Sequence, residues 1–509
     1  MNIMRVQNIR RVNGNRLEYS YTVEGEWRKY FEPGNPMWVE YSQPVDQVPD
    51  SVAVLPLVGN VIVLASLMDA DIYVDEIDRD FYECIEEFIQ GYDNIMPDHV
   101  HFKHRDIVHA DKIVHTPLSQ TEQEENLLFF SGGVDATFSL ITHLEEKPAL
   151  VTIWGADIPW DNEESWKQAI GFNQEVADRY DLKMLPIRSN FRKSFHNDHI
   201  ETFSMELVQD WWWSAFHHSV AMMCLAAPIS FGKRKKLYFA SSCSSKDRKE
   251  WGDYVLASDP QIDNHVRFCG CQVVHDGYDF SRFDKIKHIC DFYENEAVKP
   301  YLRVCYLSNS GQNCGICEKC ACVIMSMMII GADPTAYGFH FEEEELPRYF
   351  AAGVQEMARS EKYACLSLYK DIQTAYREKY SIEEVPPVLR TFYETDLEDL
   401  ADFLHVPNNE CIAKEKAIKQ TQEQLYRQIG QLRYELQTST GCALALMPGK
   451  ADDASRILLE EKRTLEEQLQ QITHSMSWKI TKPLRYAKAV LRKLKNGYAL
   501  TKDYANIQR

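Results

Sequence analysis

The feature that most constrains the fold is a regular alternation of strand-like and helical segments that begins near residue 125. The apolar stretches and helical patterns follow one another at 127–130, 136–146, 149–157, 164–181, 182–190, 211–230 and 235–244. Strands separated by helices of this length predict a parallel sheet with covered faces and right-handed crossovers. We therefore expect an α/β fold with a Rossmann-like parallel sheet over residues 123–335.

Residues 1–122 have a different pattern, typical of an α+β module. Strand-like runs occupy 16–25 and 70–77, and a helical pattern occupies 80–95. The apolar segment 51–68, SVAVLPLVGNVIVLASLM, is interrupted by Pro56, Gly59 and Asn60. We interpret this segment as paired strands and not as a membrane-spanning helix.

The C-terminal part changes character again after a helical extension expected at 336–410. Residues 411–475 have heptad-like spacing of Leu with Glu, Gln and Lys, which predicts a coiled coil or a helical hairpin and a route to a homo-oligomer. Residues 476–509 are basic, and their apolar residues share one helical face. This tail resembles the tails of bacterial glycosyltransferases and other surface-polysaccharide proteins. It can contact an anionic membrane peripherally, or pack on the protein's own acidic body.

The composition limits the functions and the cellular compartments that we expect for this protein. The formal net charge of −20 disfavours broad binding to nucleic acids, because a strongly acidic surface repels phosphate backbones. The first twenty residues hold no apolar segment of the secretory type, so we expect a cytoplasmic protein. In a reducing compartment, the 14 cysteines are expected to serve as metal ligands or buried thiols and not as disulfides.

Cysteines cluster in the segment RVCYLSNSGQNCGICEKCACVIMSM. Cys305, Cys314, Cys317 and Cys320 combine two successive CxxC steps with a fourth thiol nine residues upstream. Four thiolates suit a structural Zn²⁺, and Lys319 can offset part of their charge. Cys322 is a substitute ligand just outside this spacing. Buried free cysteines and an iron–sulfur cluster remain the alternatives.

The segment LLFFSGGVDATFS places two glycines and an acid at the end of a buried strand. Glycines let backbone N–H groups approach anionic oxygens closely, and the start of the following helix adds the positive end of its dipole. No Lys-Ser or Lys-Thr pair follows, so the Walker type of phosphate loop does not fit. The alternative is an ordinary tight turn.

The segment resembles the PP-loop of the ATP pyrophosphatase family, whose signature is SGGxDS and whose fold is of the adenine-nucleotide α-hydrolase (HUP) type. The resemblance implies that Ser131, Gly132, Gly133 and Val134 wrap pyrophosphate, and that Asp135 holds Mg²⁺ or fixes the loop. Ala136 stands where the family has serine, and Thr137 carries the next hydroxyl. Gly155 and Asp157 end the second strand, where the resemblance implies that adenine and ribose bind. Ser241 lies at the end of the fourth strand, and ligands gather at the carboxyl ends of parallel strands. Ordinary loops are the alternative for both stretches.

A PP-loop followed by CxxCxxC is similar to 7-cyano-7-deazaguanine synthase and related bacterial proteins. In that family a zinc site lies beside the active site, and ATP activates a carboxylate for attack by ammonia. The similarity covers roughly residues 125–335. Within it, the polar stretches 258–264 and 275–282 suggest His275 and Asp276 for general acid/base work and Arg282 for carboxylate recognition. Ordinary turns are the alternative for these stretches, and Asp263 and His218 are lesser candidates.

These observations predict an ATP-dependent, AMP- and pyrophosphate-forming ligase or amidotransferase-like enzyme, with ATP, Mg²⁺ and structural Zn²⁺. Its small-molecule substrate would belong to a nucleobase-type or surface-polysaccharide pathway. One alternative is sulfur transfer through Cys243, which lies at the end of the predicted strand at 235–244. Another is a scaffold whose nucleotide site has decayed, which Ala136 would signal.

Overall fold

The computed structural model describes residues 1–116, 125–251, 255–305, 311–315, 317–340, 364–385 and 389–398. Of these, all but residues 364–366 and 394–398 belong to one compact unit, which contains the candidate site. The predicted coiled coil at 411–475 and the predicted tail at 476–509 lie outside the described residues.

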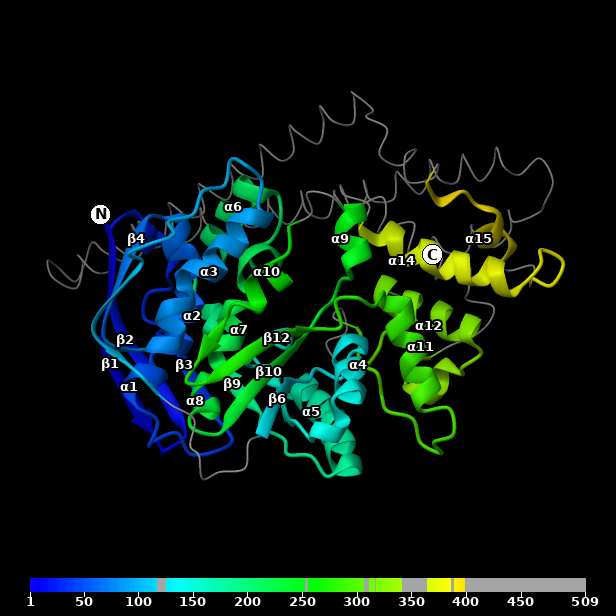
Figure 1. Cartoon of the computed structure of the whole chain (residues 1–509), viewed down its shortest axis with the longest axis horizontal. Coiled ribbons are helices and arrows are strands. Elements are labelled where there is room, and N and C mark those ends of the chain that lie inside the picture. Colours follow the sequence, from blue (N-terminus) through cyan, green and yellow to red (C-terminus); the bar gives the residue numbers. More distant parts are fainter. Residues whose placement is uncertain are drawn as a thin grey trace, which may run out of the picture. The chain divides into compact units, whose positions relative to one another are not determined.

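The predicted parallel strands are present and form the centre of an α/β fold. In chain order they are β6 (Glu125–Phe129), β7 (Ala149–Val151) with β8 (Ile153–Trp154), β9 (Ile187–Ser189) and β10 (Arg234–Ala240). A further strand, β12 (Cys271–Asp276), was not predicted from the sequence and pairs parallel with β10. A short strand, β11 (Arg267–Phe268), pairs antiparallel with β12. Figure 1 shows β6, β10 and β12 side by side in the middle of the view.

The order of these parallel strands in space differs from their order in the chain. β7 pairs with β6, and β8 pairs with β9. Leu150 of β7 also donates its N–H to the Lys183 carbonyl at 2.8 Å. The segment 149–154 therefore lies between β6 on one side and the segment leading into β9 on the other. The spatial order is therefore β9, β8 with β7, β6, β10 and β12, or 3-2-1-4-5. In such a doubly wound order, the loops after the first and fourth strands diverge and leave a crevice at their carboxyl ends. Here these strands are β6 and β10.

The N-terminal strands belong to the same hydrogen-bonded sheet as β8 and β9, which is mixed and seven-stranded, whereas β7, β6, β10, β12 and β11 form a five-stranded sheet. β3 (Trp38–Tyr41) pairs antiparallel with β9, and the order continues through β2 (Arg16–Glu24), β1 (Asn2–Val12), β4 (Ala70–Asp78) and β5 (Val108–Val114). One hydrophobic core contains Leu17 and Val39 from these strands together with Leu127 and Leu237 from β6 and β10.

The segment 51–68 is helical, so the prediction of paired strands was wrong. It forms α1 (Asp50–Ala53) and α2 (Leu55–Leu67), and Pro56 stands in the first turn of α2, where proline is tolerated. Gly59 lets α2 approach α7 (Val220–Leu225) closely, because a Cβ there would lie 2.4 Å from Cys224 Sγ. A helix buried on every side loses the periodicity that distinguishes it from a strand.

The apolar segment 211–230 is not one helix, as the sequence suggested. It forms a π-helical turn (Trp213–His217), α7 and α8 (Ala227–Ser230). The remaining helices agree with the expected alternation or extend it, and they are α3 (Arg79–Ile95), α4 (Val134–Thr142), α5 (Glu163–Tyr180), α6 (Asn197–Val208), α9 (Ser245–Trp251), α10 (Pro260–Asp263), α11 (Arg282–Phe292), α12 (Glu318–Ile330), α14 (Ala364–Lys379) and α15 (Arg390–Glu394).

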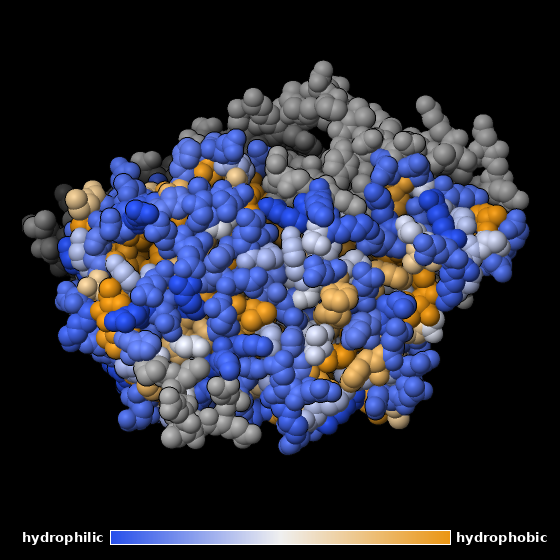
Figure 2. Space-filling model, in the orientation of Figure 1, coloured by the Kyte–Doolittle hydropathy of each residue, from blue (hydrophilic) through white to orange (hydrophobic). Residues whose placement is uncertain are grey.

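The surface carries many charged and polar side chains, as the composition leads one to expect (Figure 2). The face drawn in Figure 2 is mostly hydrophilic, and its hydrophobic residues occur in small scattered groups. Within the described ranges, no helix combines the length and the apolar character needed to cross a bilayer.

Candidate functional site

The glycine loop connects β6 to α4 and is held from behind by α5. Gly132 has a φ of +76°, and a Cβ at this position would lie 2.6 Å from Asn173 Oδ1. Asn173 in turn donates to the carbonyl of Phe130 at 3.0 Å, which fixes the end of β6. Both the conformation and the close approach therefore require glycine at position 132.

Gly133 has a different role, because it is the N-cap of α4. Its φ is −80°, and a Cβ there would make only ordinary contacts, 3.4 Å from Ser131 Oγ and 3.5 Å from the Arg303 carbonyl. The N–H of Gly133 donates to Ser131 Oγ at 3.3 Å, whereas no side-chain cap accepts from the first N–H groups of α4 itself. These N–H groups and the positive end of the helix dipole make the arrangement of an anion site.

A pocket opens beside this loop, at the carboxyl ends of β6, β8 and β10. Its polar and charged lining comprises Ser131, Asp135, Thr152, Asp157, His218, Ser242, Arg282, Arg303, Cys305 and Lys319. Phe129, Val151, Ile158, Met222 and Phe239 supply apolar walls. The pocket thus lies at the crevice that the strand order creates.

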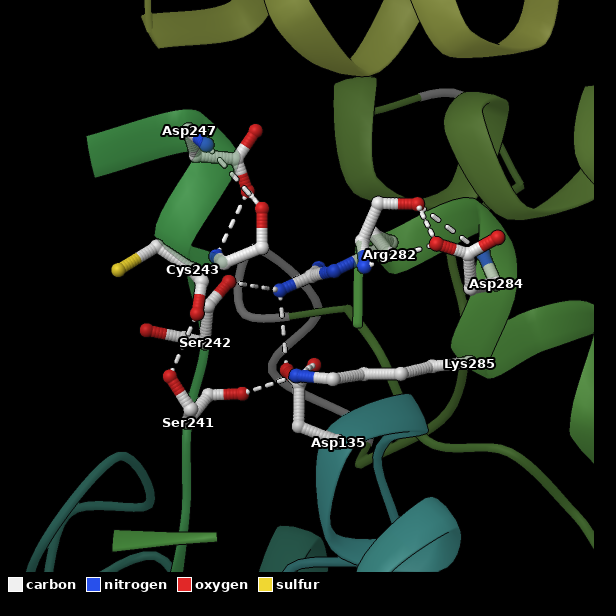
Figure 3. A network of polar contacts seen from close by, with 10 residues as sticks. Asp135, Ser241, Ser242, Cys243, Asp247, Arg282, Asp284 and Lys285 are labelled. Atoms are coloured by element: carbon white, nitrogen blue, oxygen red, sulfur yellow. Dashed lines mark hydrogen bonds and ion pairs between the residues drawn. The ribbon is translucent and has the colours of Figure 1, made fainter. Parts of the chain in front are cut away.

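Asp135 lies in the first turn of α4 and is bound by two cations from α11 (Figure 3). Its Oδ2 is 2.9 Å from Arg282 Nη2 and its Oδ1 is 3.3 Å from Lys285 Nζ. Burial would raise the pKa of Asp135, but Arg282 and Lys285 lower it below its ordinary value. Both carboxylate oxygens therefore fix the loop to α11, which is one of the two roles that the resemblance implied.

The same cations also reach the loop that follows β10. Arg282 donates to the Ser242 carbonyl at 3.1 Å and Lys285 donates to the Ser241 carbonyl at 2.6 Å (Figure 3). Ser281 caps α11 through a capping box with Asp284, which fixes where the helix begins. The ends of β6 and β10 are thus joined by one polar network.

Asp157, which follows β8, is exposed and lines the pocket. Partial desolvation would raise its pKa, but His218, Arg303 and Lys319 together lower it, so the carboxylate is ionised at neutral pH. Among the described residues, no cation lies within ion-pair distance of it. Asp157 is therefore the pocket carboxylate that is most available to a metal ion or to a substrate.

Four predicted nucleotide-binding residues do not line this pocket: Gly132, whose conformation shapes the loop, and Gly155, Thr137 and Ser241. Gly155 is required by packing, because it has a φ of +118° and a Cβ there would lie 1.9 Å from the Ser189 carbonyl. Thr137 is buried inside α4. Ser241 is buried and donates to the Cys243 carbonyl at 2.6 Å, while its neighbour Ser242 reaches the pocket.

His275 also lies away from the pocket, which corrects its expected place beside the substrate. Its Nδ1 is 2.7 Å from Asp263 Oδ2, and both side chains are almost fully buried. Asp263 also accepts hydrogen bonds from Ser219 and Ser258, at 2.5 and 2.6 Å. This network joins the start of α7 to β12. Asp276 pairs instead with His143, at 3.0 Å.

The four predicted metal ligands come together. The Sγ atoms of Cys305, Cys314, Cys317 and Cys320 all lie within 4.8 Å of one another. Tetrahedral zinc with bonds near 2.3 Å places its sulfurs about 3.8 Å apart, and the pairs 314–320 and 305–317 are each separated by 4.0 Å. Hydrogen bonding from Cys320 lowers the pKa of Cys317 below the ordinary value of a thiol. The donor set and its dimensions therefore fit Zn²⁺.

The other singled-out thiols are buried outside this cluster. Burial raises the pKa of Cys322 to about 12, and its thiol is not among the four clustered sulfurs. Burial likewise raises the pKa of Cys243 to about 12. In Figure 3 the Cys243 side chain points away from Arg282 and Asp135. Neither cysteine has the exposure of a reactive thiolate.

The sequence reasoning missed Arg303 and Lys285 altogether and assigned Lys319 only to the thiolates. Arg303 donates its backbone N–H to the Gly132 carbonyl at 2.8 Å and its Nε–H to the Ser131 carbonyl at 3.2 Å. A signal was present, because Arg303 stands two residues before Cys305 and Lys319 stands between Cys317 and Cys320. Residues so close to the ligands in the chain must lie near the cluster in the folded protein, so a cluster beside the pocket places them there too.

Comparison with protein-family models, with curated proteins and with solved structures finds no match to this chain.

Proposed function

We propose that this chain is an ATP-dependent enzyme that forms AMP and pyrophosphate, with the PP-loop type of HUP fold that its glycine loop resembles. The observation that carries the proposal is the uncapped start of α4, which opens with the loop 131–133 into a pocket lined by Arg282, Arg303 and Lys319. A helix N-terminus and several cations in one crevice suit a polyphosphate.

In this proposal the phosphates bind at Gly133 and the first turn of α4, beside Arg303 and Lys319. The adenine and ribose lie against the apolar wall after β8, which includes Ile158. Asp157 is better suited than Asp135 to bind Mg²⁺, because both oxygens of Asp135 are engaged by cations. When bound, Mg²⁺ would stabilise the charge that develops on the pyrophosphate leaving group.

The proposed reaction has two steps. An oxygen of a substrate carboxylate or amide attacks the α-phosphorus, and the bond to the bridging oxygen of the β-phosphate breaks, so that pyrophosphate leaves. Ammonia or an amine then attacks the activated carbon and loses a proton, and AMP leaves with the bonding electrons. The helix N-terminus and the pocket cations stabilise the charge that develops during the first step.

Of the alternatives, sulfur transfer receives no support from Cys243, because that thiol is buried and its pKa is raised. The scaffold hypothesis rests on Ala136, whose methyl group lines the pocket where the family carries a hydroxyl. An assignment to surface polysaccharides depends on the tail, which lies outside the described residues.

Gly133→Ala tests the proposal with little risk to the fold, because its φ is negative and a Cβ meets only ordinary contacts. We expect release of pyrophosphate and AMP from Mg-ATP, measured across a panel of carboxylated substrates with ammonium, to fall at least about tenfold in this variant. Gly171→Ala is the matched control, because it lies in α5 with open space around it. If the wild-type protein binds ATP but never cleaves it on any substrate, the scaffold hypothesis replaces the enzyme.

A further inference from the structure

The segment 303–305 belongs to two sites at once. Arg303 holds the glycine loop through hydrogen bonds to the carbonyls of Gly132 and Ser131, and two residues later Cys305 contributes a thiol to the four-cysteine cluster. Both Arg303 and Cys305 line the pocket. Any movement of the Cys305 sulfur is therefore transmitted to the loop by a very short piece of chain.

Lys319 makes a second, independent connection between the two sites. It stands between the ligands Cys317 and Cys320 in the first turn of α12, and it lines the same pocket. α12 packs against α11, the helix whose Arg282 and Lys285 bind Asp135. The cluster therefore holds two pocket cations, Arg303 and Lys319, through neighbouring residues of the chain, and it is linked to Arg282 through the packing of α12 on α11.

We propose that metal binding at the four cysteines sets the affinity of the pocket for nucleotide triphosphate, by holding Arg303 and Lys319 where they contact the phosphates. The proposal rests on the nucleotide binding proposed above and adds its regulation. The cluster would then regulate nucleotide affinity in addition to stabilising the fold.

The physical reason is that the metal replaces weak contacts with coordinate bonds. Apart from the sulfur contacts, Cys305 is tied to the other ligands by Asn313, whose Oδ1 accepts the N–H groups of Val304 and Cys305 at 3.0 and 3.3 Å. Four metal–sulfur bonds close the loop between residues 305 and 320 and limit its freedom. Because coupling between two sites is reciprocal, bound nucleotide should also retain the metal.

The first test measures binding of Mg²⁺ with α,β-methylene-ATP, which cannot be cleaved between the α and β phosphates, to the full chain by calorimetry. We expect the zinc-loaded protein to bind this probe at least about tenfold more tightly than protein stripped by a chelator, and added zinc to restore the affinity. Equal affinity in the two forms would overturn the coupling and leave the proposed function standing. No binding to the zinc-loaded form would instead refute the proposed nucleotide site.

The second test distinguishes the contribution of the Arg303 charge to nucleotide binding from the contribution of the metal. Arg303→Met keeps all four thiols and the aliphatic part of the side chain, and we expect it to retain zinc but to lose about tenfold in affinity for the probe. Arg105→Met is the matched control, because Arg105 forms an exposed ion pair with Glu86. In the wild type, the probe should slow zinc release to a colorimetric chelator, and in Arg303→Met it should not. Unchanged affinity in Arg303→Met would overturn the proposal.

Discussion

Asp135 belongs to the glycine-loop motif, but its contacts in the structure are ion pairs with two cations of α11. The motif predicted that it would meet a metal ion or fix the loop, and the structure joins its two oxygens to Arg282 and Lys285. Only the second of these roles uses the contacts that are present. The sequence could place Asp135 beside the loop, but its partners lie about 150 residues further along the chain.

We expect Asp135→Asn to destabilise the protein by about 3 kcal/mol at pH 7, because it leaves two largely buried cations without their counter-charge. The pKa of Asp135 is lowered in the folded state, so its ionised form contributes stability above the ordinary value of 3.8. This contribution is lost as the pH falls through the lower, folded-state pKa.

The measurement is the melting temperature of wild type and Asp135→Asn from pH 7 downward. The difference between the two proteins should be largest near neutrality and should shrink below about pH 4. A difference that is constant across this range would mean that the ion pairs contribute no stability. Asp181→Asn serves as a control, because Asp181 is an exposed acid whose ion pair is with the exposed Lys147.

At the scale of elements, α2 shows why an apolar run is ambiguous. Its residues are buried on all sides, so no alternation of polar and apolar positions reveals a helical period. The interruptions at Pro56, Gly59 and Asn60 then favoured the interpretation as paired strands. What makes the helix possible is a tertiary contact with α7, which depends on the absence of a side chain at Gly59.

Gly59→Ala is therefore expected to destabilise the protein by about 1–3 kcal/mol, although alanine has the higher helix propensity. The added Cβ would lie 2.4 Å from both Cβ and Sγ of Cys224, so the two helices must separate. Urea denaturation checks this expectation, with Gly171→Ala in α5 as the control that should be neutral or slightly stabilising. A stabilised Gly59→Ala would show that helix propensity outweighs the α2–α7 contact.

At the scale of the whole molecule, the cysteine cluster ties the segment around Cys305 to the start of α12. We expect purified protein to hold one zinc ion per chain, and Cys317→Ala to lose it and to melt at least about 5 °C lower, because metal-binding free energy adds to folding free energy. Cys322→Ala is the matched control, since this buried thiol lies outside the cluster and should leave the metal content unchanged. Zinc retained by Cys317→Ala would contradict the assignment of the four ligands.

The sequence by itself determined the features that depend on neighbouring residues. The parallel strands from β6 to β10, the glycine turn before α4 and the spacing of three of the four cysteines are local patterns, and each was predicted from residues close together in the chain. Cys305 joined them at a separation of nine residues. Local patterns are legible because backbone preferences and hydrophobic periodicity act over one or two turns of chain.

Only the tertiary structure decided which side chains meet in the pocket. His275 is not among the residues that line the pocket, because it forms a buried pair with Asp263. Arg303 and Lys319 line the pocket because they are close in the chain to ligands of the cysteine cluster. The tertiary structure also joined the N-terminal strands to the parallel strands through β3 and β9. These outcomes depend on strand order and on contacts between distant residues, whose free energies exist only once the core is packed, so no local pattern encodes them.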